Sequence, residues 1–114
     1  MAFAFPPEAR LRRPREFEAV LSGGVRLHEK LLTLALRDNA LAGARMGFAI
    51  SARAVPRAVD RNRIKRQARD SFRRNRGSLP ARDLVILARS GAAAAPSAEL
   101  RETLERLWQK LRAR

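Results

Sequence analysis

The chain has 114 residues, which fits a single domain over 1–114, and it contains no cysteine, which excludes disulfides and thiolate metal sites. Lys and Arg total 25 against 11 Asp and Glu, so the net charge is +14 and the expected partner is a polyanion. No run approaches the roughly 18 apolar residues of a membrane-spanning helix, and no basic segment precedes the short apolar run at the start, so we expect a cytoplasmic protein with no membrane partner.

The N-terminal part of the chain predicts an arm followed by a helix. Residues 1–13 contain prolines and several basic residues and should form an irregular arm. Pro14 suits the first turn of a helix, because its missing N–H has no partner there in any case. A stripe at i, i+3, i+4 spacing begins at Phe17, and the glycine pair that starts at Gly23 should end this helix.

Three apolar stretches predict strands. Apolar residues alternate with smaller ones over 31–37 and again over 45–51, and DNALAG at 38–43 has the composition of a turn. We therefore expect the first two strands to pair as an antiparallel hairpin. The run LVILA at 84–88 is apolar throughout, which is typical of a strand buried on both faces.

Two more helices are expected in the second half of the chain. The segment RNRIKRQARDSFRRNR, residues 61–76, has helical apolar spacing, and Gly77 lies at its end. After a loop at 91–96, Ser97 is a candidate N-cap for a last helix whose leucine stripe includes Trp108. A core position for this tryptophan follows from the stripe.

The predicted order is helix, strand, strand, helix, strand, helix. It indicates the α+β class, a small two-layer sandwich of one sheet and about three helices. The strand–helix–strand unit spans 45–89, and the general rule for parallel strands favours a right-handed crossover.

The basic helix is unusual because its charges are almost all of one sign. Eight basic residues stand with one acid, Asp70, and only a narrow face is apolar: Ile64, Ala68, Ser71 and Phe72. Like charges at i, i+4 destabilise a helix by a few tenths of a kcal/mol per pair, so repeated pairs indicate an anionic partner. A solvated surface helix, the alternative, predicts acids and bases mixed along it.

Phosphate is the natural anion for this surface, because arginine presents a planar fork of donors to it. A DNA-reading helix-turn-helix needs a second helix close by, whereas strands flank this one, so we favour RNA over DNA. The candidate RNA-binding residues are Arg53, Arg57, Arg61, Asn62, Arg63, Lys65, Arg66, Arg69 and Arg73.

No protein-based catalytic site is expected. His28 is the only histidine, and no acidic cluster has metal-ligand spacing, so a metal site is not expected and a surface position suits this side chain. Asp60 and Asp70 are better interpreted as counter-ions to the surrounding arginines than as catalytic acids. Phe17 suits either a core or a cleft wall, and Phe48 suits either face of its strand.

The motif RNRIKRQARDSFR resembles the signature of the bacterial ribonuclease P protein subunit. The flanking segments FPPEARLRRPREFEAV, RMGFAIS, DLVILAR and GAAAAPSAELRETLERLW resemble the same family in the same order. The resemblance implies a protein that joins a catalytic RNA, ribonuclease P RNA, to remove the 5′ leader of precursor tRNA. It also implies that the RNA performs the hydrolysis with Mg²⁺ that the RNA mainly binds, and that the crossover is left-handed.

The resemblance also assigns residue roles. It places Arg61, Asn62, Arg63, Lys65, Arg66 and Arg69 in the RNA-contacting motif. It implies a cleft for the leader with Phe17 on its first helix and Leu21 and Leu34 near other cleft positions, and Phe48 is the fourth candidate for this cleft. The family often has aromatic residues near Leu21 and Leu34, and often two lysines where this chain has Ala52 and Arg53. A general RNA-binding or ribosome-associated basic protein and a basic membrane-surface protein are the alternatives.

Overall fold

A four-stranded sheet forms the centre of the fold. The computed structural model describes residues 7–114. The strands are β1 (Val25–His28), β2 (Leu32–Asp38), β3 (Arg45–Phe48) and β4 (Arg82–Ala88), and their order across the sheet is β1-β2-β4-β3. β1 pairs antiparallel with β2, β2 pairs antiparallel with β4, and β3 runs parallel to β4.

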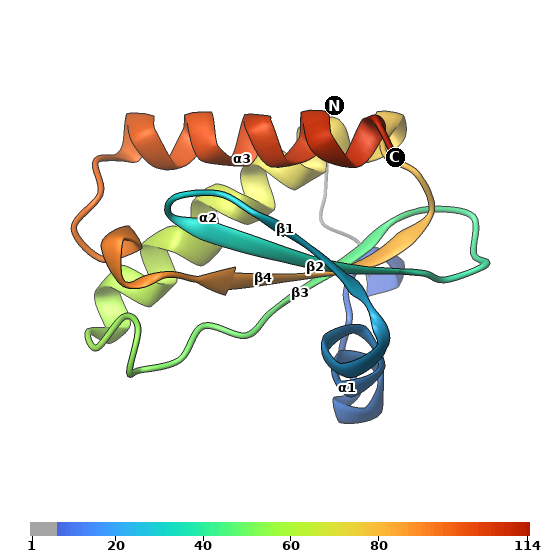
Figure 1. The fold of residues 1–114 in the computed structure, drawn as a ribbon, viewed down its shortest axis with the longest axis horizontal. Coiled ribbons are helices and arrows are strands. Elements are labelled where there is room, and N and C mark those ends of the chain that lie inside the picture. The colour runs from blue at the N-terminus through green and yellow to red at the C-terminus, as the bar shows by residue number, and fades with distance from the viewer. Residues whose placement is uncertain (1–6) are drawn as a thin grey trace.

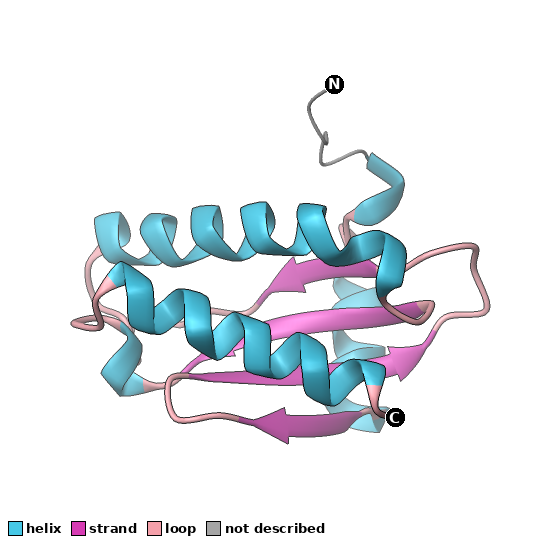
Figure 2. Cartoon of the chain, turned by 90° about the horizontal axis from the view of Figure 1, so that it is seen from above, coloured by secondary structure: helices cyan, strands magenta, loops and turns pink. Residues whose placement is uncertain are grey.

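Three helices cover the sheet. The helices α2 (Ala58–Asn75) and α3 (Ser97–Arg112) lie together on one face, and α1 (Pro14–Gly23) lies on the other (Figure 1). Figure 2 shows α2 and α3 side by side above the strands. The α+β class and the three predicted helices are confirmed, and α1 adds a third layer at one end of the expected two-layer sandwich.

The predicted hairpin between 31–37 and 45–51 is wrong. β4 lies between β2 and β3, so that Ile86 pairs with Leu34 on one side and with Phe48 on the other. The alternating pattern identified both strands, but alternation carries no information about which strand is the neighbour. The continuous apolar run of β4 is what a central position requires, because Leu84, Val85 and Ile86 are fully buried.

The hairpin that the fold does contain joins β1 to β2. The residues Val25–His28 were not predicted as a strand, because their alternation of apolar and polar residues covers only four positions directly after a glycine pair. The parallel unit β3–α2–β4 is the connection for which the resemblance implies a left-handed crossover. β3 ends at Phe48, earlier than predicted, and Ser97 is the first residue of α3 while Pro96 takes the N-cap position.

The predicted irregular arm is partly a sheet element. Residues 1–6 lie outside the described part of the chain, and Pro7–Ala9 form a 3₁₀ turn. Arg10 bridges Met46 in parallel, and the Leu11 N–H donates to the Met46 carbonyl at 3.1 Å. Leu11 is 6% exposed, so this segment packs along the outer edge of β3.

The main core lies between the sheet and the helices α2 and α3. The predicted apolar face of α2 is confirmed, since Ile64, Ala68, Ser71 and Phe72 are all buried. Trp108 is fully buried, as its position on the leucine stripe predicted, and its indole N–H donates to Ser71 Oγ at 2.7 Å. A smaller core under α1 joins Leu11, Val20, Ala35 and Val85.

The remaining sequence candidates take surface positions. His28 is exposed and lies 3.2 Å from Thr33 Oγ1 through its Nδ1. Within residues 7–114, no three His, Cys, Asp or Glu side chains come together as a metal site, and no helix is long and apolar enough to cross a membrane.

Glu29 ties the β1–β2 turn to α3. Its carboxylate pairs with Lys110 and, at 2.7 Å, with Arg106, and it is largely buried. The hydrogen bond from Lys110, and to a smaller extent the one from Arg106, holds the pKa of Glu29 below its ordinary value of 4.5. Because a lowered carboxyl pKa stabilises the folded state only while the group is ionised, this contribution is complete above pH 4.5 and is lost as the pH falls through the folded-state value.

We therefore predict that Glu29→Gln lowers the free energy of unfolding at pH 7 by on the order of 1 kcal/mol, because the cationic partners are half exposed. The difference from the parent should shrink as the pH falls below 4.5 and through the lowered folded-state pKa of Glu29. Urea unfolding followed by Trp108 fluorescence at several pH values measures it, with the exposed Glu105→Gln as control. A constant difference across the range would contradict the prediction.

Candidate nucleic-acid interface

A groove of about 500 Å³ lies between α1, β3 and α2. Phe17 from α1 and Phe48 from β3 supply aromatic surface, and Lys65 and Arg69, one turn apart on α2, supply charge. The complete lining is Arg10, Leu11, Phe17, Met46, Gly47, Phe48, Lys65 and Arg69. The groove therefore offers ring faces and positive charge to the same ligand.

The floor of the groove requires a glycine. Gly47 is buried in β3, and the edge of the Phe17 ring lies directly over it. A Cβ atom at this position would lie 2.4 Å from Cζ of Phe17 and 3.0 Å from Cβ of Leu11. The absence of a side chain at Gly47 is what allows the Phe17 ring to approach the backbone of β3.

The aromatic and the cationic residues of the groove are in contact through Arg69 and Phe48. The guanidinium carbon of Arg69 lies 5.2 Å from the centroid of the Phe48 ring, within cation–π distance. A planar guanidinium that covers an aromatic ring also offers its own outer face for stacking. Arg69 thus connects the apolar part of the groove to the charged surface of α2.

A second depression of about 440 Å³ continues from Arg69 along the outer side of α2. Its lining is Asn62, Arg66, Arg69, Asp70 and Arg73. Asp70 pairs with Arg73 and, at 2.8 Å, with Arg74, and Asp60 lies 3.9 Å from Arg57. Both aspartates contact arginines, as expected of counter-ions, and within residues 7–114 no carboxylate pairs with Lys65 or Arg66.

Arg61 and Arg63 hold neighbouring loops. Nη1 of Arg61 donates to the carbonyls of Val55 at 2.8 Å and Pro56 at 2.9 Å, and Nη2 of Arg63 donates to the Ala93 carbonyl at 3.3 Å. Both side chains are half-buried. Arg53 and Arg57 are exposed near the start of α2 and extend the basic surface beyond it.

Comparison with known proteins identifies the family of this chain. The model of the family described as Ribonuclease P matches residues 5–112. This chain belongs to the ribonuclease P protein family. The ribonuclease P protein component of Thioalkalivibrio sulfidiphilus is 40% identical over 107 residues, covering 94% of this chain and 89% of that protein.

Solved structures share the fold. The RNase P protein of Staphylococcus aureus matches with a TM-score of 0.83 at 22% identity, covering 90% of this chain and 94% of that one. The RNase P protein of Thermotoga maritima, in complex with 1-(4-fluorophenyl)-2-thiourea, matches with a TM-score of 0.80 at 29% identity, covering 89% of this chain and 98% of that one.

Two of the four residues assigned to a leader cleft lie elsewhere in this ribonuclease P protein. Leu34 is 0% exposed and packs in the main core with its neighbours two residues away, Leu32 and Leu36, so it cannot line an accessible cleft. Leu21 is half-buried against the small core and does not line the groove. Phe17 and Phe48 both line it.

Four groove residues were missed from the sequence: Arg10, Leu11, Met46 and Gly47. The first two were expected in an irregular arm, and the parallel bridge from Arg10 to Met46 that brings them to β3 leaves no pattern in the sequence. The signal for Gly47 was present, because a glycine inside a strand often marks a close approach of another group.

We predict that Gly47→Ala displaces Phe17 from the floor of the groove. The new methyl group overlaps the ring, and relief of such overpacking costs roughly 1–3 kcal/mol. Thermal unfolding and the affinity for a leader-bearing RNA should both fall. Gly77→Ala is the matched control, because nothing lies within 4 Å of its added Cβ. If the two variants have the same unfolding temperature and the same RNA affinity, the contact of Phe17 with Gly47 does not shape the groove.

We predict different effects for two arginines of the basic motif. Arg61→Ala leaves the Val55 and Pro56 carbonyls without their donor and should lower the free energy of unfolding by about 1–3 kcal/mol. Arg66→Ala removes the same charge from an exposed site and should change stability by less than about 0.5 kcal/mol. It should instead lower the slope of log affinity against log salt for RNA by about one.

Chemical denaturation and RNA titration at several salt concentrations measure both effects. If Arg61→Ala is as stable as the parent, the loop contacts have no energetic role and Arg61 acts on RNA alone.

Proposed function

We propose that this ribonuclease P protein binds ribonuclease P RNA through the basic surface of α2 and holds the 5′ leader of precursor tRNA in the groove. The observation that carries the proposal is the presence of two aromatic rings and two cations in the lining of one groove. Proteins that hold single-stranded nucleic acid combine stacking platforms with a positive wall, since every base has a ring face and every nucleotide a phosphate.

The orientation of the leader follows from the two sides of the groove, one aromatic and one positively charged. Bases of the leader would lie toward Phe17 and Phe48, and phosphates toward Lys65 and Arg69. The depression beside Asn62, Arg66 and Arg73 continues the positive surface away from the groove, which suits a larger folded RNA. About six phosphate contacts there would weaken binding on the order of 10³-fold between 50 and 200 mM salt.

The cleavage chemistry is assigned to the RNA with Mg²⁺. Mg²⁺ prefers oxygen ligands and is usually held by phosphates and a few carboxylates. The part of the chain that the structure describes brings together no cluster of acids that would hold it, so the metal would be bound mainly by RNA. The protein would reduce the repulsion between RNA phosphates and position the leader. We place this activity in the cytoplasm, where precursor tRNA is processed.

The experiment that tests the proposal is cleavage of precursor tRNA by a bacterial ribonuclease P RNA at low Mg²⁺, with and without this protein. The proposal predicts strong stimulation and a correct mature 5′ end. Tight, salt-sensitive RNA binding without stimulation would support the alternative, a general RNA-binding or ribosome-associated protein.

A substitution in the groove tests the position of the leader. Phe48→Ala removes a ring face and should weaken binding of precursor tRNA to the assembled enzyme by about 1–3 kcal/mol per lost stack, roughly fivefold or more. Binding of mature tRNA, which has no leader, should not change. Phe48→Leu is the matched variant that keeps apolar bulk without a ring. If both variants bind precursor as the parent does, the leader lies elsewhere.

A further inference from the structure

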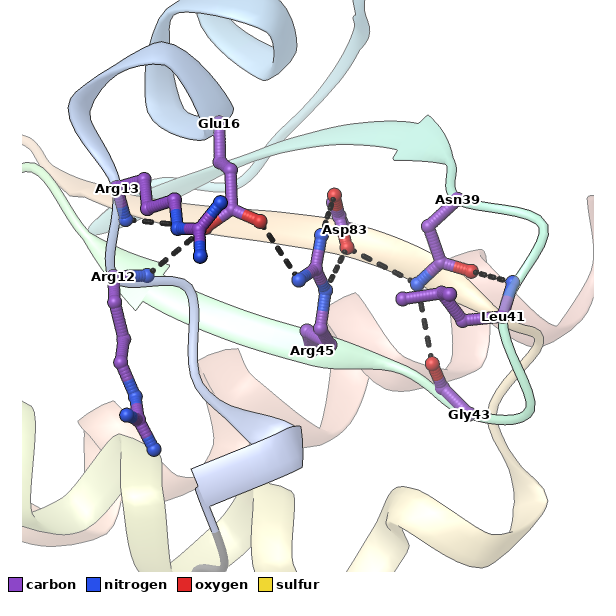
Figure 3. A network of polar contacts seen from close by, with 8 residues as sticks. All are labelled: Arg12, Arg13, Glu16, Asn39, Leu41, Gly43, Arg45 and Asp83. Atoms are coloured by element: carbon purple, nitrogen blue, oxygen red, sulfur yellow. Dashed lines mark hydrogen bonds and ion pairs between the residues drawn. The ribbon is translucent and has the colours of Figure 1, made fainter.

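Arg45 joins α1 to the sheet through two carboxylates. On β3, its Nε and Nη2 donate to the two oxygens of Asp83 on β4 at 2.8 and 2.7 Å, and its Nη1 donates to Oε2 of Glu16 on α1 at 2.8 Å. Figure 3 shows the guanidinium between the two acids. All three of its nitrogens are therefore engaged within the protein.

The same two carboxylates continue the network in both directions. The other oxygen of Glu16 accepts the backbone N–H groups of Arg12 and Arg13 at 3.3 and 3.1 Å, at the start of α1. Asp83 Oδ1 also accepts Nδ2 of Asn39 at 3.0 Å, from the loop before β3 (Figure 3). Arg45 thus links the first turn of α1, the central strand and that loop.

Besides this network, α1 is held by the small core, against which half-buried Phe17 and Leu21 pack. Val20 is the only fully buried residue of this ten-residue helix. Arg45 and Gly47 are two residues apart and point to the same face of β3. Their partners on α1, Glu16 and Phe17, are consecutive. The ion pair and the contact of the Phe17 ring with Gly47 therefore lie side by side across the same junction.

We propose that Arg45 is a positioning residue for the groove: its bridge between Glu16 and Asp83 fixes α1, and thereby sets where the Phe17 ring meets the leader. This inference rests on the proposed function. Direct contact with phosphate is a poor role for this arginine, because two acids neutralise it and its side chain is 19% exposed. Its removal changes the wall of the groove and leaves the basic surface of α2 unaltered.

The test uses enzyme assembled from the full chain and ribonuclease P RNA. Arg45→Gln removes the bridge. Arg106→Gln is the control, since it removes the same charge from α3, where Arg106 pairs with Glu29 of the β1–β2 turn. The Kd values of a precursor tRNA with a leader and of mature tRNA are measured for both. We expect Arg45→Gln to lower the preference for precursor roughly fivefold, the loss of about one stacked base.

The affinity of the protein for the RNA and the Kd of mature tRNA should stay at the values of the control. In the free protein, the NMR shift of the Gly47 amide should move in Arg45→Gln and stay in Arg106→Gln, because the Phe17 ring lies against that residue. Glu16→Gln keeps an acceptor for the backbone N–H groups while weakening the ion pair, and it should shift the preference in the same direction even if Arg45→Gln is poorly folded.

The outcomes separate the two proposals. If the parent enzyme prefers precursor and both Arg45→Gln and Glu16→Gln keep that preference, Arg45 has only a structural role and the inference fails. If the parent itself shows no preference for precursor, the proposed function of the groove fails first. A loss of preference only in the Arg45 and Glu16 variants supports the positioning role.

Discussion

The placement of β4 between β2 and β3 is the constraint on which the groove depends. Because β4 takes the central position, β3 becomes an edge strand that contacts β4 on one side and the segment at Arg10 on the other. An edge strand can present its residues to a ligand, and β3 presents Gly47 and Phe48. Had β3 paired with β2, as the hairpin prediction required, β2 would have occupied the side of β3 that β4 takes.

The electrostatics of α2 depend on the same packing. The helix buries a narrow apolar face on the sheet, so its many cations are confined to the remaining surface. Arg61 and Arg63 use part of that charge to donate to backbone carbonyls, and Asp70 offsets Arg73 and Arg74. The cations left for a phosphate are those toward the groove and on the outer side, such as Lys65, Arg66 and Arg69. The motif thus combines residues that build the site with residues that are available to bind.

The sequence was most informative where one local rule decided the outcome. The buried face of α2, the core position of Trp108 and the start of α1 at Pro14 all follow from periodicity and capping, which act over a few residues. Strand partners do not, because pairing is decided by contacts between residues far apart in the chain. Leu34 shows the consequence: its pattern correctly placed it on a strand, yet which face of that strand meets the helices α2 and α3 depends on tertiary packing. The alternation in β1 covers only four residues, and the bridge at Arg10 leaves no pattern in the sequence.

Arg45 illustrates why charge alone does not identify a binding residue in so basic a chain. Asp83 and Glu16 together carry two negative charges against its one positive charge, so Arg45 adds no net positive charge to the α1–β3 junction. Lys65 and Arg69, across the groove, have no such pair of acids around them. In the proposed complex, Arg45 would therefore add little to the attraction of a phosphate, which Lys65 and Arg69 would provide from α2, and the bases of the leader would face Phe17. The distribution of charge along the groove depends on Arg45, which is neutralised within the fold, as much as on Lys65 and Arg69, which have no such pair of acids.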